Sequence, residues 1–242
     1  MRFFLVCLTL GCCAGWAQAM GFTEDPTEKL TKSWDLAAVK SLEVRGQIDF
    51  ELVAGPSPRV TVETTRALFD QLTVSNWWGA ATVAIESGLR GPRELGAVKA
   101  TITLPELTEL RVSDQSSGRG EWPGAWGTLR VTDRSSIDLV IEGTNFLVET
   151  SWLTRVSLGG HVSQLRVDER HQSQIDATNL AADVAQISLD ESSVYTAGPT
   201  GHGSGLARHL SRVVIDSPEP WEALELREGS VRETRPEPSP QP

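Results

Sequence analysis

The chain has 242 residues, of which 22 are lysine or arginine and 32 are aspartate or glutamate, so its formal net charge at pH 7 is −10. This length fits one large all-β domain or two small ones. The acidic balance argues against nucleic acid as a partner, because phosphate backbones are bound by clustered basic residues, and against electrostatic adhesion to an anionic membrane.

Residues 1–19 have the features of a secretory signal peptide. Arg2 supplies a positive charge, an apolar stretch follows to Ala14, and Ala17-Gln18-Ala19 places small residues where a signal peptidase cleaves. The stretch is too short for a permanent anchor, which takes about 20 apolar residues. We therefore expect a mature chain that begins at Met20 and has no integral membrane span.

All three cysteines of the chain lie inside this segment: Cys7, Cys12 and Cys13. Cleavage after Ala19 would leave a mature chain with neither thiols nor disulfides. A lipoprotein is the alternative, because Gly11 precedes Cys12 and a lipid-modified Cys12 would become the new N-terminus. Thr9 stands where the lipobox normally has leucine, which favours cleavage after Ala19. Both routes predict export, to the periplasm or the cell surface.

The mature chain divides into three parts by composition. Residues 20–36 are polar and are interpreted as a leader. Residues 218–242 hold six of the thirteen prolines and predict a disordered, Pro/Glu-rich tail. Residues 37–217 remain as a single domain.

Within this domain, apolar residues alternate with a period of two, which is typical of half-buried β-strands. The alternation is clearest in segments 42–44, 48–52, 60–62, 83–85 and 98–104. A helix could form only over the short segments 66–72 and 179–184. The predicted fold class is therefore all-β.

The second half of the domain repeats every nineteen residues. Hydroxyl residues recur at this spacing: Ser116, Ser135, Thr154, Ser173 and Ser192. A series two residues further on is β-branched: Ile137, Val156, Ile175 and Val194. A third series contains Asp114, Asp133 and Asp190, with Trp152 and His171 between the last two. A fixed period with β-branched residues in register indicates a repeat architecture.

Nineteen residues at about 3.3 Å each give roughly 60 Å of chain, enough for one coil of short strands joined by bends. Coils stacked about 4.8 Å apart would pair their backbone groups with the coils on either side. A propeller blade needs about 40 to 45 residues and does not fit. A β-sandwich also accommodates short alternating strands, but the constant register favours a parallel β-helix, or solenoid, with coils of about 19 residues.

Three segments carry a family resemblance. Val39-Lys-Ser-Leu-Glu-Val-Arg-Gly-Gln-Ile-Asp-Phe-Glu-Leu-Val-Ala-Gly55 opens the domain, Val60-Thr-Val62 follows, and Ile102-Thr-Leu-Pro-Glu-Leu-Thr-Glu-Leu110 leads into the serine-rich repeats. In these pieces and their order, over about residues 38–216, the chain resembles the putative auto-transporter adhesin, head GIN domain family. The resemblance implies a right-handed β-helix that is exported, typically in Gram-negative bacteria, and brings no catalytic residue. Trp77-Trp78 departs from the family pattern, which is more polar there.

No catalytic, cofactor-binding or metal-binding residues are predicted. The histidines His161, His171, His202 and His209 lack the H-E-x-x-H and H-x-H spacings of metal sites. Ser204 lies one position late for a nucleophile elbow, so Gly201–Gly205 is interpreted as a flexible loop. The hydroxyl series is interpreted as a hydrogen-bonded ladder at the bends, because serine and threonine are poor cation ligands beside carboxylates.

An enzymatic alternative rests on charged residues that recur along the repeats. β-Helical polysaccharide lyases gather carboxylates and basic side chains in a groove on one face. The corresponding candidates here are Asp114, Asp133, Arg111, Arg130 and Arg166. No acid–base pair is recognisable among them, and charges in register are more often a solvated surface.

The tryptophans are the better candidates for ligand contact, because exposed indoles stack on sugar rings and anchor interfaces. The candidates are Trp77, Trp78, Trp122 and Trp126. A buried tryptophan that covers an end of the solenoid is an equally good interpretation of any of them. The sequence thus predicts an exported cell-envelope domain with a binding, adhesion-like or scaffolding role and no catalysis. Its partner would be a glycan or an envelope protein, and its oligomeric state is open.

Overall fold

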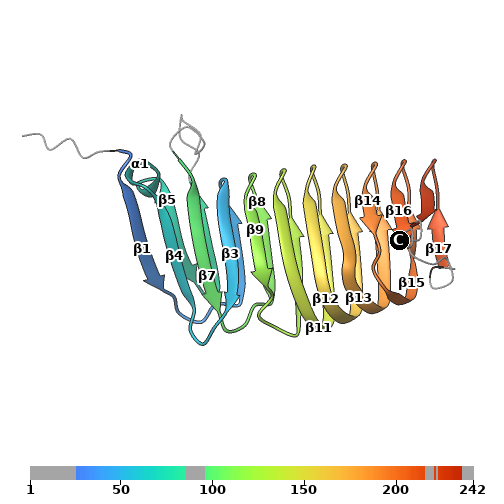
Figure 1. Cartoon of the computed structure of the whole chain (residues 1–242), viewed down its shortest axis with the longest axis horizontal. Helices are drawn as coiled ribbons and strands as arrows, with labels where there is room; N and C mark the ends of the chain where they lie inside the picture. The colour runs from blue at the N-terminus through green and yellow to red at the C-terminus, as the bar shows by residue number, and fades with distance from the viewer. Residues whose placement is uncertain (1–25, 86–95, 216–220, 222, 236–242) are drawn as a thin grey trace, which may run out of the picture.

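The computed structural model describes residues 26–85, 96–215, 221 and 223–235. This part of the chain is a stack of β-strands with one short helix, α1 (Arg66–Phe69). The strands form an elongated solenoid (Figure 1). The expected all-β solenoid with coils of about 19 residues is confirmed, because neighbouring coils pair in parallel with that spacing, as in Ile137↔Val156 and Val156↔Ile175. The expected signal peptide, with Cys12, lies outside the described residues.

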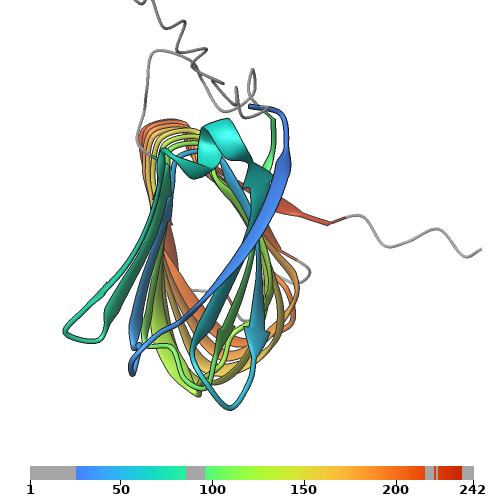
Figure 2. The same cartoon turned by 90° about the vertical axis from the view of Figure 1, so that its left-hand side faces the viewer.

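Two walls enclose the interior (Figure 2). Wall 1 contains, in spatial order, β5 (Leu72–Trp77), β6 (Ala80–Ile85), β2 (Ser41–Arg45), β8 (Glu109–Ser113), β10 (Trp126–Val131), the second halves of β11 (Ser136–Thr150), β12 (Arg155–Glu169) and β13 (Gln174–Leu189), then β15 (Thr200–Ala207) and β17 (Ala223–Leu226).

Wall 2 contains β1 (Lys29–Asp35), β4 (Arg59–Thr65), β7 (Val98–Leu104), β3 (Ile48–Ala54), β9 (Ser117–Glu121), the first halves of β11, β12 and β13, then β14 (Val194–Thr196), β16 (Arg212–Ile215) and β18 (Val231–Thr234).

The described strands extend beyond the expected domain of residues 37–217 on both sides. β1 lies in the expected leader but pairs antiparallel with β4 over its whole length, and Leu30 and Trp34 are its half-buried residues. At the other end, β17 and β18 lie in the expected tail and add to the two walls by pairing with β15 and β16. The proline-rich residues 236–242 lie outside the described part.

In the described residues, eight coils turn from wall 1 to wall 2 at a corner of two consecutive residues with positive φ. The corner residues are Gly46-Gln47, Asp114-Gln115, Asp133-Arg134, Trp152-Leu153, His171-Gln172, Glu191-Ser192, His209-Leu210 and Glu228-Gly229. In most corners the amide of the second residue donates to the carbonyl of the first residue in the next coil, as in Leu153 to His171 (3.1 Å) and Gln172 to Glu191 (2.9 Å). The corners therefore stack in register.

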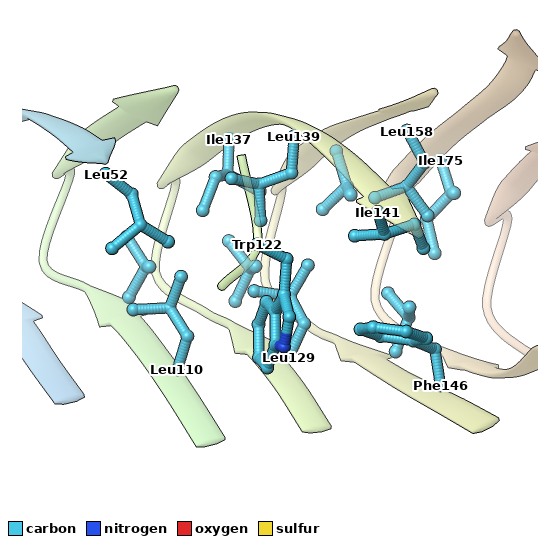
Figure 3. Close-up of a cluster of buried hydrophobic side chains, with 14 of the residues drawn as sticks. Leu52, Leu110, Trp122, Leu129, Ile137, Leu139, Ile141, Phe146, Leu158 and Ile175 are labelled. Atoms are coloured by element: carbon cyan, nitrogen blue, oxygen red, sulfur yellow. The ribbon is translucent and has the colours of Figure 1, made fainter. Parts of the chain in front are cut away.

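The interior is filled by the inward-facing apolar residue of each strand pair (Figure 3). Two tryptophans fill it beside glycines of wall 1. A Cβ on Gly127 would lie 2.1 Å from the ring of Trp122, and one on Gly203 would lie 2.3 Å from the ring of Trp221. Gly201–Gly205, expected to be a flexible loop, belongs to strand β15. Gly203 has no side chain, and this leaves room for the ring of Trp221.

Trp122 lies in the core with only 6% of its surface exposed. Its indole N–H donates to the Leu107 carbonyl (3.1 Å), and its ring packs edge-on against Phe146 with the centroids 5.4 Å apart. A ligand at the surface cannot reach it. Its burial speaks against the expected ligand contact at Trp122, and the alternative of a tryptophan covering an end of the solenoid does not apply, because Trp122 packs between coils inside the stack.

Substituting Leu139 tests the register directly, because Leu139 is fully buried and the next residue, Val140, faces outwards. We expect Leu139→Ala to lower the free energy of unfolding by about 2–5 kcal/mol through lost burial and a cavity. Val140→Ala should change it by less than about 0.5 kcal/mol. Denaturant unfolding measures both, and equal effects would contradict the assigned register.

Candidate functional site

The corners change character along the stack. Those near the start of the solenoid carry glycine and polar residues, as in Asp114-Gln115 and Asp133-Arg134. Later corners place large residues at the same positions: Trp152, Leu153, His171, His209 and Leu210. Positive φ costs an ordinary L-residue roughly 1–2 kcal/mol, so a bulky side chain there is unusual and needs a reason. Trp152 and Leu210 are also 57% and 68% exposed.

These later corners line a shallow groove of about 620 Å³, here called the corner groove. Its lining residues are Trp152, Leu153, His171, Gln172, Glu191, Ser192, His209, Leu210 and Glu228. The groove runs along the stack across successive coils, so its length follows the solenoid axis. It combines aromatic, apolar and ionisable side chains on a surface fixed by stacked backbone.

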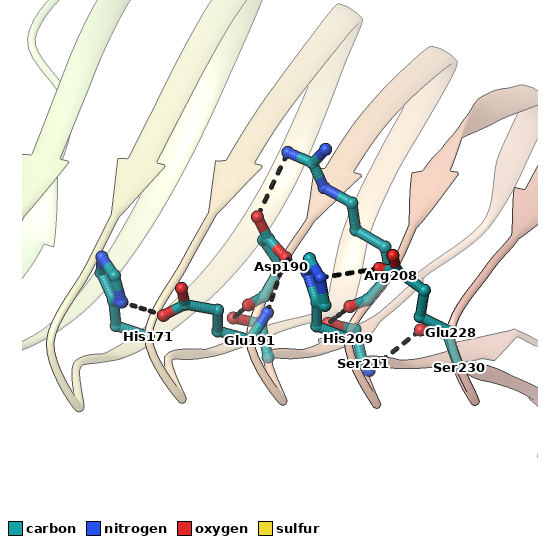
Figure 4. Close-up of polar contacts among 9 residues, drawn as sticks. His171, Asp190, Glu191, Arg208, His209, Ser211, Glu228 and Ser230 are labelled. Carbon is teal, nitrogen blue, oxygen red and sulfur yellow. Dashed lines mark hydrogen bonds and ion pairs between the residues drawn. The ribbon is translucent and has the colours of Figure 1, made fainter.

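An aromatic pair lies at the N-terminal end of the corner groove. Trp152 and His171 occupy the same position in adjacent coils, and their rings stack with the centroids 4.3 Å apart and the planes 18° from parallel. His171 also contacts the carboxylate of Glu191 in the next coil (Figure 4). The stack leaves the indole partly exposed and forms a flat platform.

An ionisable cluster lies at the other end of the groove (Figure 4). His209 hydrogen-bonds to Asp190 and lies 2.8 Å from Glu228, and Arg208 lies 3.2 Å from Asp190. The hydrogen bond to Asp190 raises the pKa of His209, and the charge of Glu228 adds to this effect. Partial burial acts to raise the pKa of Asp190, but His209 and Arg208 outweigh it, so the pKa is lowered. The cluster thus holds carboxylate acceptors beside cationic donors.

A buried carboxyl lies on the inner side of the same corners. Glu169 precedes His171 by two residues, points into the interior and is fully buried. Burial raises the pKa of Glu169 well above its ordinary value of 4.5. The Val194 amide offsets this only in part, because it donates to the Ser173 carbonyl (3.0 Å). Among the described residues neither Glu169 oxygen has a donor, so the effect of burial, which disfavours the ionised form, predominates.

The expected hydroxyl ladder is present at the third position of the corners. Ser173, Ser193 and Ser211 each donate to a carbonyl three residues earlier, at 2.7, 2.6 and 2.7 Å. Ser116, Ser135 and Thr154 occupy the same buried position in earlier coils. The hydrogen-bonded ladder is thus present at Ser173, Ser193 and Ser211, whereas the hydroxyls of Ser135 and Thr154 have no partner among the described residues.

One member of each predicted series is displaced by one residue. The structure places Ser193, and not Ser192, in the ladder, and Glu191 replaces Asp190 as the first corner residue. The cause is an extra residue in β13: Ser157 pairs with Asp176, but Gly159 pairs with Asn179. The extra residue makes the spacing to the next coil twenty at Gln174↔Val194, and the spacing after it is eighteen, as in Val194↔Arg212.

The remaining predicted ligand contacts lie outside the corner groove. Trp126 is exposed on the outer side of wall 1, beside a separate hollow that includes Gln164 and Val184. Trp77 and Trp78 are exposed at the tip of the β5–β6 hairpin. The structure therefore does not bring the predicted tryptophans together.

The charged residues of the lyase alternative do not form one cluster either. Arg111 and Arg130 lie on wall 1, where both pair with Glu109 (2.8 and 3.3 Å). Partial burial opposes ionisation of Glu109, yet these partners lower its pKa. Asp114 and Asp133 lie at the corners, and Arg166 is in register with Leu147 rather than with Arg130. These guanidinium groups are thus neutralised within their own wall.

Residues 26–85, 96–215, 221 and 223–235 contain no group of three or more histidine, cysteine or acidic side chains placed to hold a metal ion. Over the same residues, no helix has the length and apolarity needed to cross a membrane.

Comparison with known proteins identifies the family. The family described as putative auto-transporter adhesin, head GIN domain, matches residues 39–215. No curated protein matches the chain.

Solved structures share the fold at low sequence identity. A putative adhesin from Bacteroides fragilis superposes with a TM-score of 0.69 at 14% identity, covering 86% of this chain and 96% of its own. A putative adhesin from Parabacteroides merdae gives 0.65 at 11% identity, with 86% and 97% covered. A protein from Parabacteroides distasonis described as a putative lipid binding protein gives 0.56 at 14% identity, with 86% and 97% covered.

Glu169 predicts how stability depends on pH. Its pKa is raised in the folded state, so its stability contribution is complete below pH 4.5 and is lost as the pH rises through the folded-state pKa. This loss of unfolding free energy is at most about 1.4 kcal/mol per pH unit for one carboxyl group. We expect Glu169→Gln to abolish it, because glutamine does not ionise in this range. Urea unfolding of both proteins at about pH 5 and about pH 8 gives the change in the free energy of unfolding between the two pH values. Equal changes in the two proteins would contradict a raised pKa of Glu169.

Proposed function

The chain belongs to the putative auto-transporter adhesin, head GIN domain family, and we propose that it acts as an exported binding domain without catalytic activity, with its ligand in the corner groove. The observation that carries this proposal is the placement of Trp152, Leu153 and Leu210 at strained corner positions that other coils fill with polar residues. Strained backbone that carries exposed large side chains is a recurring property of binding sites.

A glycan is the ligand that the groove favours. The face of an exposed indole stacks on a sugar ring, and Trp152 is held for this by its stack on His171. Among the lining residues, Glu191 and Glu228 supply acceptors for sugar hydroxyls, and His209 supplies a donor. The two carboxylates favour a neutral or amino-bearing glycan over a polyanionic one. The repeat of corners along the stack suits an extended chain.

The cell envelope is the compartment that sequence and family favour. The N-terminal residues 1–19 have the composition of a signal peptide, and the family description refers to adhesins. A groove of fixed shape on a rigid solenoid suits attachment to an envelope polysaccharide. We propose periplasmic or surface exposure, with lipid attachment at Cys12 as the alternative form.

Substituting Trp152 tests the proposed binding site. We expect Trp152→Ala to weaken binding to neutral envelope glycans about tenfold, the effect of losing about 1.4 kcal/mol at a central aromatic contact. Glycan-array screening followed by calorimetry measures the change.

Gln115→Ala is the matched control, because Gln115 occupies a corner with the same positive φ but lies outside the groove. The control should bind like the unmodified chain. If Trp152→Ala binds as tightly as the control, the corner groove is not the site. Turnover of a bound polysaccharide would instead favour the enzymatic alternative.

Leu210 allows a test of whether the strain serves binding. Leu210 has a φ of 63° and is largely exposed, so Leu210→Gly should raise the free energy of unfolding by up to about 1 kcal/mol. The same substitution should weaken glycan binding, because it removes an apolar side chain from the groove. Thermal unfolding and calorimetry give the two values. A variant that is less stable and binds normally would contradict this account.

A further inference from the structure

The β5–β6 hairpin forms a second exposed surface. Its two strands are joined by Trp78 and Gly79, which have φ of 53° and 82° and form a two-residue turn. Figure 2 shows this hairpin, in teal at the lower left, standing out from the stacked walls. Figure 1 places β5 at one end of the solenoid and β14 to β17, which belong to the coils of the corner groove, towards the other. The two surfaces are therefore separate.

The hairpin is uncharged along its whole length. No aspartate, glutamate, lysine or arginine occurs from residue 71 to residue 85, although 22% of the residues in the chain are charged. β5 is also an edge strand, since among the described strands it pairs only with β6. Edge strands are normally protected by charged residues or proline. An unprotected, uncharged hairpin that stands out from the fold indicates a surface that is covered in use.

Two adjacent indoles occupy the tip. Trp78 is 91% exposed, Trp77 is also largely exposed, and in the described part of the chain neither indole N–H donates to a protein group. The tip is held against the neighbouring coil, because the Gly79 carbonyl accepts hydrogen bonds from the Lys40 amide (2.8 Å) and the Ser41 amide (3.2 Å). The indoles are thus presented by a fixed turn.

From these observations we infer that the Trp77–Trp78 tip docks into the interfacial region of a lipid bilayer. An indole has an apolar body and a polar N–H, and tryptophan concentrates at the level of lipid headgroups for this reason. Insertion of the hairpin desolvates no charge. The net charge of −10 opposes adhesion to anionic lipid, so the partner is a zwitterionic surface. This inference is independent of the corner groove.

The test uses the processed chain purified from the host, with its N-terminus fixed by intact mass, and phosphatidylcholine vesicles. We expect vesicle flotation to show binding that is insensitive to salt, and the double variant Trp77→Ala/Trp78→Ala to bind about tenfold more weakly or worse. Brominated lipids should quench the tryptophan fluorescence of the unmodified chain. They should not quench the fluorescence of the tryptophans that remain in the variant.

The matched control is Trp126→Ala/Trp152→Ala, which removes two exposed indoles away from the hairpin. It should bind vesicles like the unmodified chain, while Trp152→Ala alone reports on the corner groove. Equal binding by the two double variants, or no binding by any protein, would overturn the inference. So would a hairpin variant that changes only the oligomeric state in light scattering, because the tip would then be a contact between copies of the chain.

Discussion

The stacked corners are the constraint on which the rest of the structure depends. Each corner uses two residues with positive φ, and their amide–carbonyl bonds to the next coil hold successive coils in register. The register decides which residue of every strand faces inwards, because a shift of one residue would turn the whole apolar set outwards. The core, the buried hydroxyl ladder and the exposed corner groove all follow from the same turn repeated along the stack.

The periodic part of the fold could be predicted from the sequence, whereas its interruptions could not. Ser116, Ser135, Thr154 and Ser173 are spaced regularly and occupy equivalent buried positions. The extra residue after Asp176 shifts the next coil, so the ladder continues at Ser193 instead of Ser192. Gly203 resembled a loop residue because its partner, Trp221, lies eighteen positions later and outside the repeat pattern, where only the three-dimensional packing reveals it.

The candidate site was harder to predict than the fold, because the sequence does not show which tryptophans are buried and which are exposed. Trp122 belongs to the core, while Trp152, which interrupts the aspartate series, lies in the groove. The only sign of the corner groove in the sequence is that Trp152 and His171 interrupt the aspartate series. Its meaning depends on the positive φ of the corners, which a repeat of side-chain types does not disclose. The tip that we propose for membrane docking lies at one end of the solenoid, and the groove that we propose for glycan binding lies towards the other.

The most direct test of the binding account is an NMR titration of the indole N–H signals with neutral envelope glycan fragments. Each exposed tryptophan then reports on its own surface: Trp152 on the corner groove, Trp126 on wall 1, and Trp77 and Trp78 on the hairpin. The account predicts that the Trp152 signal shifts with saturable dependence on glycan and that the other three stay in place. Shifts confined to Trp126 or to the hairpin pair would contradict it.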